Sequence, residues 1–487
     1  MTITIVGGGT AGWLAAAMLS HQLSAELFTI QLVESSELGS IAIGESTVPP
    51  FVGLLRRLGI DEHDFVTRTD ATYKLGIKFI DWQHQRQQYF HPFGVLGQNI
   101  GQHDFYQCWL RARAEGDGSA LQDFSPCNIM AEQGRFFHPE QARNTPIGGA
   151  SYALHVDALS VARYLGGYAK KRAVKTIDGL VTQVIQRDNG FIDHLMLEDG
   201  RKVAGDFFID CSGFKALLIG QTLGSEFIDW RQYLPCDRAI AVKTTAIEPV
   251  LPYTTATAQK SGWGWRIPLS HNTGHGTVYA SDFCSDSDAQ SILMRSLDGK
   301  RVDEPRLIPF VTGHRREIWK HNCLSLGLAS GFIEPLESTS IHLIARGVEF
   351  FLRYFPSTAC KPALAREYNR RMIADYEEVR DFLMLHYCTT GRTDTPFWRY
   401  CQQLPVPDSL AERIALFRAQ GGLRQGVDEL FRATSWQSVF EGMGIRPEGY
   451  CPRINNLSFS DITTQMQAAR QAIAGMVKTL PRHDDFL

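Results

Sequence analysis

The sequence predicts an α/β protein in which a two-layer domain of strands and helices contains an inserted β-sheet and precedes a mostly helical C-terminal region. A β-branched strand at residues 3–6 leads through a glycine-rich turn into an apolar helix. Several short strands separated by turn signals fill residues 180–210, and helical spacing of apolar residues dominates from Pro362 onward. We therefore expect one domain over residues 1–360 and a helical domain over residues 361–487, which covers the substrate side.

The overall composition limits the classes of partner and compartment. Of the 487 residues, 44% are hydrophobic and 21% are charged, which is typical of a globular protein. The net charge of −3 gives no electrostatic basis for binding nucleic acid or an anionic membrane, and no apolar run approaches the roughly 20 residues that span a bilayer. The chain begins in strand material without a leader, and its ten cysteines form no CxxC pair or metal-ligand cluster. We therefore expect a cytoplasmic protein with free thiols and no metal site.

The turn after the first strand has the spacing of a dinucleotide-binding loop. Gly7, Gly9 and Gly12 fit G-x-G-x-x-G between a strand and a helix. The first glycine makes the turn, the second lets a pyrophosphate approach the backbone, and the third lets helix and strand pack closely.

Two further features support a bound dinucleotide. The pyrophosphate would lie on the amides of the helix start, around Thr10 and Ala11. Glu34 ends the next predicted strand, residues 28–33, about 20 residues after the loop, where a carboxylate accepts ribose hydroxyls.

Residues 72–82 alternate in the manner of a half-buried strand. Tyr73 and the apolar residues at every second position share one face, whereas Lys74 and Lys78 share the other. Two interpretations fit this pattern. The lysines either keep an edge strand soluble, or one of them points into a cavity, where its amine can hold or carry a reactive group. Local geometry does not choose between the two lysines.

A helix and three short strands follow one another in the middle of the first domain. Asp157 caps the helix, and the strands 180–186, 191–197 and 202–210 are joined by hairpin turn signals. The last strand ends in Asp-Cys-Ser-Gly at residues 210–213. A β-meander that returns to a strand ending Asp-x-x-Gly resembles many two-domain flavoproteins.

Two later segments each have two interpretations. Trp263 and Trp265, at i and i+2 of a predicted strand, lie on one face and form either a rigid wall or ordinary core packing. Thr339 and Ser340 stand at the start of a predicted helix, where their amides suit a small anion. Glu337 beside them is either a capping carboxylate or a catalytic one.

Together these residues resemble the flavin-dependent halogenases of the tryptophan-halogenase family, nearly from end to end. The glycine loop is shared with every flavin and nicotinamide fold, whereas W-x-W-x-I-P, the lysine strand and Pro-Leu-Glu-Ser-Thr are specific to the family. The motifs that carry the resemblance are Gly7–Trp13, Gly44-Glu45-Ser46-Thr47-x-Pro49, Tyr73-Lys74-x-x-x-Lys78-Phe79, Asp210-Cys211-Ser212-Gly213-Phe214, Tyr233-Leu234-Pro235-Cys236-Asp237-Arg238, Trp263-x-Trp265-x-Ile267-Pro268 and Glu334-Pro335-Leu336-Glu337-Ser338-Thr339. The resemblance implies a FAD-binding, hydroxylase-like domain.

The resemblance also implies an activity, halogenation with reduced FAD, oxygen and chloride or bromide. Halide bound near Thr339 and Ser340 would become hypohalous acid, which passes through an internal tunnel to Lys74. Lys74 would deliver electrophilic halogen to an aromatic ring, and Glu337 would orient that species or take the ring proton. The paired tryptophans would keep the organic substrate away from the flavin.

The remaining implied residues contact the cofactor or the substrate. The cofactor-binding residues are Gly7, Gly9, Thr10, Ala11, Gly12, Glu34, Ser46, Gly327 and Ile341. The substrate-binding residues are His91, Phe93 and Ser338.

Departures from the family pattern leave the substrate open. Ser340 stands where tryptophan-specific members have glycine, within the stretch expected to bind halide. The strap that grips a free amino acid is not identifiable, and the region of Trp436, Phe440 and Glu441 is where we look for it. Tryptophan, indole and other electron-rich arenes therefore remain open as substrates, and both chloride and bromide as the halide.

Two other functions fit part of the sequence. A flavin-dependent aromatic monooxygenase shares the fold but does not need Lys74, and a non-catalytic flavin-binding protein needs neither Lys74 nor Glu337. The sequence contains no second dinucleotide loop and no reductase domain, so we expect a separate NAD(P)H-dependent flavin reductase to supply reduced FAD. The other expected partner is a small aromatic substrate, and a homodimer remains open.

Overall fold

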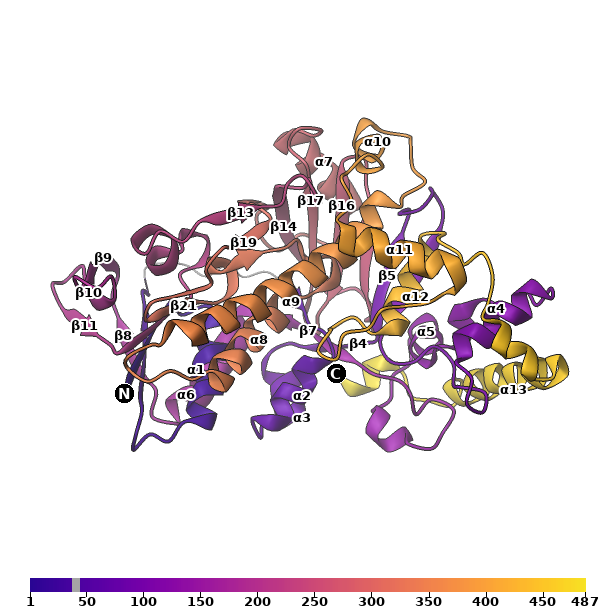
Figure 1. The fold of residues 1–487 in the computed structure, drawn as a ribbon, viewed down its shortest axis with the longest axis horizontal. Coiled ribbons are helices and arrows are strands. Elements are labelled where there is room, and N and C mark those ends of the chain that lie inside the picture. Colours follow the sequence, from indigo (N-terminus) through magenta and orange to yellow (C-terminus); the bar gives the residue numbers. More distant parts are fainter. Residues whose placement is uncertain (37–43) are drawn as a thin grey trace. The chain divides into compact units, whose positions relative to one another are not determined.

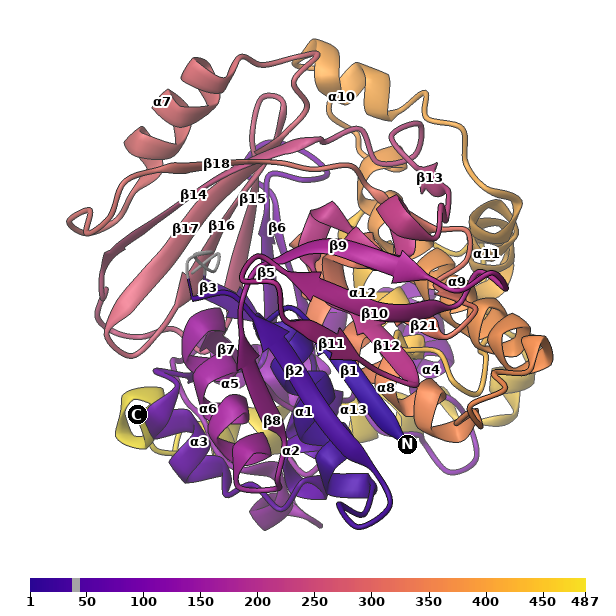
Figure 2. The same cartoon turned by 90° about the vertical axis from the view of Figure 1, so that its left-hand side faces the viewer.

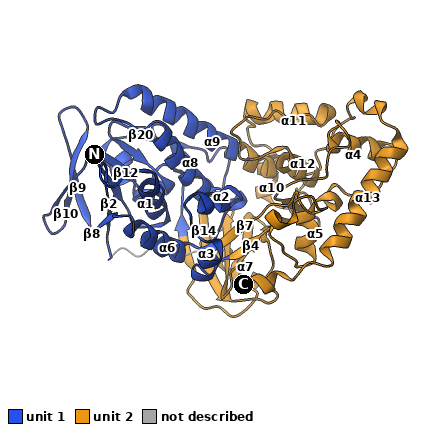
Figure 3. Cartoon of the chain, turned by 90° about the horizontal axis from the view of Figure 1, so that it is seen from below, with its two compact units in different colours: residues 1–71, 156–237, 308–379 blue, residues 72–155, 238–307, 380–487 orange. Residues whose placement is uncertain are grey.

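The computed structural model of the chain describes residues 1–36 and 44–487, and its elements are labelled in Figure 1. These residues form two compact units, each assembled from three separate segments (Figure 3). The segments of unit 1 are residues 1–71, 156–237 and 308–379, and those of unit 2 are residues 72–155, 238–307 and 380–487. In the described part of the chain, no helix combines the length and hydrophobicity that a membrane span requires.

The units divide elsewhere than at the expected boundary of residue 360. That residue lies within unit 1, and the long helix α9 (Pro362–Cys388) begins in unit 1 and ends in unit 2. The difference arises because the chain leaves unit 1 after residue 71 and again after residue 237 to build a second sheet. The C-terminal residues are mostly helical, as predicted, but they belong to the unit of that second sheet.

Unit 1 is built on a six-stranded sheet in the order β20-β21-β12-β1-β2-β8. Its strands are β1 (Thr2–Val6), β2 (Thr29–Glu34), β8 (Lys175–Asp178), β12 (Phe207–Asp210), β20 (Trp319–Lys320) and β21 (Cys323–Ser325). β1 runs parallel to both β2 and β12, and Val6 lies opposite Val33 and Asp210. The glycine loop that follows Val6 therefore lies at the carboxyl ends of three parallel strands, where open α/β sheets bind their ligands.

Helices pack against this sheet, and the glycine loop leads directly into one of them. Besides the first part of α9, the α-helices of the unit are α1 (Thr10–Gln22), α2 (Pro50–Arg57), α3 (Glu62–Arg68), α6 (Ala158–Lys170) and α8 (Ser340–Arg353). α1 packs against α6 and α8, and residues 12–19 of α1 are all buried because the helix is apolar on every side. Asp157 caps α6 by accepting a hydrogen bond from the Ser160 amide, as the sequence predicts.

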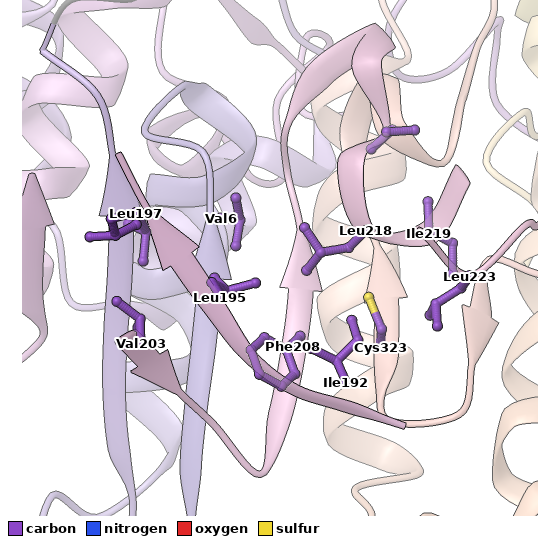
Figure 4. Close-up of a cluster of buried hydrophobic side chains, with 13 residues drawn as sticks. Val6, Ile192, Leu195, Leu197, Val203, Phe208, Leu218, Ile219, Leu223 and Cys323 are labelled. Atoms are coloured by element: carbon purple, nitrogen blue, oxygen red, sulfur yellow. The ribbon is translucent and has the colours of Figure 1, made fainter. Parts of the chain in front are cut away.

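The predicted meander is present as β9 (Val181–Gln186), β10 (Ile192–Leu197) and β11 (Lys202–Ala204). The third predicted strand divides, because residues 202–204 pair with β10 whereas residues 207–210 join the main sheet as β12. Ile192 and Leu195 of the meander share a buried cluster with Phe208 of the main sheet (Figure 4). A further small sheet contains β13 (Phe227–Asp229), β19 (Gly313–Arg315) and β22 (Gly331–Phe332).

Unit 2 is built on a seven-stranded sheet in the order β18-β14-β17-β16-β15-β5-β6, with its long strands side by side in Figure 2. The strands are β5 (Gly76–Ile80), β6 (Gln88–Pro92), β14 (Arg238–Thr245), β15 (Thr254–Ala258), β16 (Gly262–Pro268), β17 (Asn272–Tyr279) and β18 (Arg306–Pro309). β15 runs parallel to β5 and antiparallel to β16. Partners in adjacent strands share a face, so Phe79, Ala256 and Trp265 lie on one side of the sheet.

The strand predicted at residues 72–82 is two strands. β4 (Thr72–Lys74) pairs with β7 (Ala153–Asp157), whereas β5 belongs to the seven-stranded sheet. Between them, the Leu75 amide donates to the Pro252 carbonyl oxygen at 2.7 Å. The break therefore places Lys74 and Lys78 in different sheets.

The helices of unit 2 pack around this framework. Besides the end of α9, they are α4 (Phe105–Ala114), α5 (Pro126–Glu132), α7 (Asp286–Ser296), α10 (Pro396–Cys401), α11 (Asp408–Gln420), α12 (Ala433–Gly442) and α13 (Phe459–Val477). α13 packs against α4 and α5, and α12 packs against β6. β6 is the strand that carries His91, so helices far along the chain support a predicted site residue.

Candidate active site

The glycine loop has the geometry that its sequence predicts. Gly7 has a φ of +116°, which L side chains rarely adopt, and a Cβ at this position would overlap the Cys211 carbonyl oxygen. A Cβ on Gly12 would overlap the Gly7 carbonyl oxygen. Both positions therefore require glycine, Gly7 for the turn and Gly12 for close packing of helix and strand.

Gly9 differs from these two glycines, because a Cβ added there meets none of the described residues within 4 Å. Gly9 precedes α1, and the first amides of a helix, here at Thr10 and Ala11, lack intrahelical acceptors. Gly327, with a φ of +61°, lies beside this helix start, because its Cβ would be 2.9 Å from the Ala11 Cβ. The open space next to these backbone amides fits a dinucleotide pyrophosphate, as FAD binding requires.

Glu34 lies at the same loop, as the spacing predicts. Trp13 Nε1 donates a hydrogen bond to Glu34 Oε2 at 3.3 Å, and a Cβ on Gly8 would overlap the same carboxylate. Lys170 Nζ lies over the Trp13 ring, 5.1 Å from its centroid. The indole thus holds in place the carboxylate that is predicted to bind ribose, a role for Trp13 that sequence reasoning missed.

Two further predicted cofactor residues are buried in unit 1. Ser46 ends β3 (Gly44–Ser46), and Ile341 lies in the first turn of α8, which packs against α1. Burial, reinforced by the negative charge of Asp157, raises the pKa of the Glu45 carboxyl to about 7. Near neutral pH the Glu45 carboxyl is therefore present in both its protonated and its ionised form. It lies next to Ser46, a predicted cofactor residue.

The predicted halide residues lie at the start of α8. Ser338 follows the short helix η6 (Pro335–Glu337) with a left-handed φ of +62°, and Thr339 is the N-cap residue of α8. Glu337 and Thr339 are each 1% exposed, so the carboxylate and the helix start are shielded from solvent. Low dielectric strengthens the attraction of a helix N-terminus for an anion.

Lys74, the last residue of β4, is 0% exposed. Its Nζ lies 5.1 Å from the centroid of the Phe93 ring, and the residue opposite it on β7 is the small Ala153. Lysine is almost never fully buried unless it is paired or used. The interpretation of Lys74 as a solubilising edge residue is therefore wrong.

Lys78 has a different environment. It is half-buried on β5, and its Nζ lies 5.9 Å from the centroid of the Tyr253 ring. The prediction that both lysines share one strand face is wrong, because the strand breaks at Leu75. The structure thus distinguishes two lysines that the sequence pattern alone leaves equivalent.

His91 and Phe93 lie close to Lys74 within unit 2. The His91 and Phe93 rings are 6.3 Å apart at nearly right angles, and His91 lies 5.5 Å from the Phe382 ring. Phe431 stacks on Phe382 with a centroid distance of 3.7 Å. The structure therefore brings Lys74 and both predicted substrate residues of this unit into one aromatic neighbourhood.

Trp263 and Trp265 share one face of β16, as their spacing predicts, with ring centroids 6.0 Å apart. Trp265 lies opposite Ala256 on one neighbouring strand and Gly276 on the other. A Cβ on Gly276 would overlap the Trp265 ring, so the small residues provide the space that the indole fills. Both tryptophans are buried.

α12 holds the three residues considered for a substrate strap. Trp436 and Phe440 are buried, and Phe440 stacks on Phe417 at 4.2 Å. Glu441 accepts a hydrogen bond from the Tyr106 hydroxyl at 2.7 Å and forms an ion pair with Arg446 at 3.6 Å. Burial raises the pKa of the Glu441 carboxyl. These side chains already support the fold of unit 2.

The predicted site residues fall into two groups. Unit 1 contains the residues predicted to bind cofactor and halide, together with Glu337 and Ser338. Unit 2 contains Lys74, His91, Phe93 and the tryptophan pair. Sequence reasoning missed His155, a buried histidine on β7. The sequence marks it only as a polar residue within the apolar strand 153–156.

Comparison with known proteins agrees with these features. The sequence profile of the tryptophan halogenase family matches residues 2–458. A tryptophan 6-halogenase of Streptomyces toxytricini is 32% identical over 517 residues, covering 99% of this chain and 97% of the relative. The glycine loop, the lysine strand and the tryptophan pair all lie within the matched residues.

Two solved structures are similar over the whole chain. Xcc4156, a flavin-dependent halogenase from Xanthomonas campestris, is 40% identical with a TM-score of 0.95, and covers 100% of this chain and 97% of its own. BrvH, a flavin-dependent halogenase from Brevundimonas sp. BAL3, is 39% identical with a TM-score of 0.95, and covers 100% of this chain and 98% of its own. The chain therefore belongs to the tryptophan halogenase family and is a flavin-dependent halogenase that uses FAD, oxygen and halide.

Proposed function

We propose that this halogenase acts on indole, tryptophan or a related electron-rich arene, and that Lys74 delivers the halogen. The observation that carries this proposal is the complete burial of Lys74 beside Phe93. Removing an amine or ammonium from water costs free energy, so a fold that buries one next to aromatic rings compensates that cost or uses the group in chemistry.

The overall reaction defines what the residues must do. Reduced FAD, when bound, supplies two electrons with which oxygen and halide give hypohalous acid and water. Lys74 then hydrogen-bonds the acid or exchanges a hydrogen for its halogen, releasing water. The arene gives up a ring proton when it takes the halogen, and Glu337 accepts that proton or orients the halogen species. Enclosure keeps the acid from escaping.

Unit 1 would hold the halide and the cofactor. The amides of Thr339 and Ser340 at the N-terminus of α8 suit halide. Gly7, Gly9, Gly12 and the helix start would hold the pyrophosphate of FAD. The other proposed contacts with FAD are Glu34, Ser46, Gly327 and Ile341.

Unit 2 would hold the arene. His91 and Phe93 offer rings for stacking on an indole beside Lys74. Ser338 is the third residue proposed to bind substrate. Trp263 and Trp265 would bar the arene from the flavin. The helices after residue 380 would cover this site, a role that the contact of Phe382 with His91 supports.

The substrate proposal favours arenes without a free amino-acid group. The tryptophan 6-halogenase relative acts on tryptophan, so tryptophan stays among the candidates. Glu441 already accepts from the Tyr106 hydroxyl and forms an ion pair with Arg446, so the charge of its carboxylate is partly balanced before a substrate ammonium arrives. This engagement favours indole and its derivatives.

The proposal includes a partner and a compartment. A separate NAD(P)H-dependent flavin reductase would supply reduced FAD. The ten cysteines are all free, which fits a reducing cytoplasm. We also propose that the chain forms a homodimer.

One assay tests the reaction. Purified protein would be combined with a flavin reductase, its nicotinamide, FAD, oxygen and either chloride or bromide, and offered indole, tryptophan and other arenes. Mass spectrometry should find halogenated product, with indole-type substrates ahead of tryptophan. Hydroxylated product would favour a monooxygenase, and the absence of halogenated product from every arene would contradict the proposal.

Trp13→Phe is expected to weaken FAD binding about three- to tenfold, because it removes the hydrogen bond that holds Glu34 while keeping the ring. FAD titration followed by fluorescence measures the effect. Trp319→Phe is the control, because Trp319 Nε1 donates to a backbone carbonyl at His321 within the same unit. Equal losses of FAD affinity in both variants would contradict the role assigned to Trp13.

A further inference from the structure

We propose that His155 is a positioning residue for Lys74, because its imidazole bridges Thr72 and Thr254 and so fixes the strand that carries the amine. The proposal rests on the assignment of Lys74 as the halogen carrier. Thr72 and His155 are direct partners in the β4–β7 pairing, as are Lys74 and Ala153. Residues two apart on a strand share a face, so His155 and Lys74 project to the same side.

The hydrogen bonds of the bridge specify one tautomer of His155. Thr72 Oγ1 donates to the Pro268 carbonyl oxygen at 2.7 Å, so the hydroxyl proton is used. The same oxygen lies 2.9 Å from His155 Nδ1 and must accept from it. His155 Nε2, 3.0 Å from Thr254 Oγ1, then accepts from that hydroxyl. The neutral imidazole with its proton on Nδ1 satisfies both bonds.

The surroundings keep His155 neutral. Burial, followed by the electrostatic effects of the neighbouring Lys74 and His483 side chains, holds the pKa of His155 well below its usual range. The bridge is therefore intact at neutral pH. It joins β4 to β15 and to the end of β16, two strands of the large sheet in the same unit.

A second buried imidazole ties the next residue of β4. His483 Nε2 accepts from the Tyr73 amide at 3.2 Å, while its Nδ1 donates to the Val250 carbonyl oxygen at 2.8 Å. Burial lowers the pKa of His483 to about 4, so this histidine is also neutral. Two neutral rings thus hold the backbone directly before Lys74.

The backbone after Lys74 is tied as well. The Leu75 amide donates to the Pro252 carbonyl oxygen, and the Phe93 amide donates to the Leu75 carbonyl oxygen at 2.9 Å. With both flanks fixed, the Lys74 amine moves only through its own side-chain rotamers. Displacing a reactive group by about 1 Å costs up to about 100-fold in rate. Loosening the backbone on one side of Lys74 should therefore lower the yield of halogenated product more than it lowers the rate at which reduced FAD is oxidised.

The test measures coupling, the halogenated product formed per oxygen consumed, in the full-length enzyme with FAD, reductase, bromide and indole. His155→Leu should lower coupling about tenfold and release more hypohalous acid to a soluble halogen trap, while reduced FAD is oxidised within twofold of the normal rate. His155→Asn, whose amide can still donate to Thr72, should recover part of the coupling. Thr254→Val, which removes the other half of the bridge, should lose part of it.

His275→Leu is the matched control. His275 is also buried, and it bonds a threonine, with Nε2 3.1 Å from Thr244 Oγ1, but it lies on β17. This variant should lose thermal stability without losing coupling. Unchanged coupling in His155→Leu, or an equal loss in His275→Leu, overturns the proposal. If His155→Leu does not fold, unchanged coupling in both His155→Asn and Thr254→Val overturns it. Halogenation retained by Lys74→Ala would instead refute the role of Lys74 itself.

Discussion

Replacing Lys74 with alanine is expected to stop halogenation while the enzyme still oxidises reduced FAD. The residues predicted to bind FAD belong to unit 1, whereas Lys74 is a buried side chain of unit 2. Removing one group that acts in the transition state typically costs at least about 100-fold in rate. Stopped-flow absorbance follows reduced FAD, and mass spectrometry follows the halogenated arene. Hypohalous acid formed without Lys74 should appear in solution, where a halogen trap detects it.

Two variants separate this chemistry from packing. Lys74→Met keeps most of the side-chain volume beside Phe93 and should be as inactive as the alanine variant. Lys78→Ala removes the half-buried lysine of the adjacent strand and should retain halogenation. Halogenation that survives in both Lys74 variants would remove Lys74 from the mechanism, and its loss only in Lys78→Ala would transfer the role to Lys78.

The parts of the fold that depend on short stretches of sequence could be predicted. The glycine loop, the Asp157 cap of α6 and the shared face of the two tryptophans each follow from residues within one turn or one strand. Gly12 is required by its contact with the Gly7 carbonyl oxygen, and the spacing of these two glycines expresses that requirement directly. Such features need no knowledge of distant segments.

Features that depend on distant segments could not be predicted. The strand carrying Lys74 ends at that residue because Leu75 bonds to the backbone of Pro252, far along the chain. The partners of His155 are 83 and 99 residues away, so its bridge leaves no local pattern. The burial of Lys74 likewise results from tertiary packing, and only the family resemblance singled it out among two lysines with the same periodicity.

Gly9→Ala is expected to weaken FAD binding at least about tenfold without changing the melting temperature. Within residues 1–36 and 44–487 the new methyl group meets no atom within 4 Å, and Gly9 has an ordinary φ of −79°, so the fold accommodates it. The methyl group would enter the space where a pyrophosphate approaches the backbone. Lost hydrogen bonds to a charged group cost about 1.5–3 kcal/mol, which corresponds to about 10- to 100-fold in affinity. FAD titration and thermal unfolding of the FAD-free protein measure the two effects.

Gly12→Ala and Gly167→Ala complete this test, because each differs from Gly9→Ala in one respect. A Cβ at Gly12 overlaps the Gly7 carbonyl oxygen, so this variant should lose both FAD affinity and about 1–3 kcal/mol of stability. Gly167 lies in the interior of α6, and no described residue comes within 4 Å of a Cβ there, so alanine should add about 0.5–1 kcal/mol of stability and leave FAD affinity unchanged. If Gly9→Ala binds FAD as tightly as Gly167→Ala does, the pyrophosphate does not lie against Gly9, and the cofactor approaches the loop elsewhere.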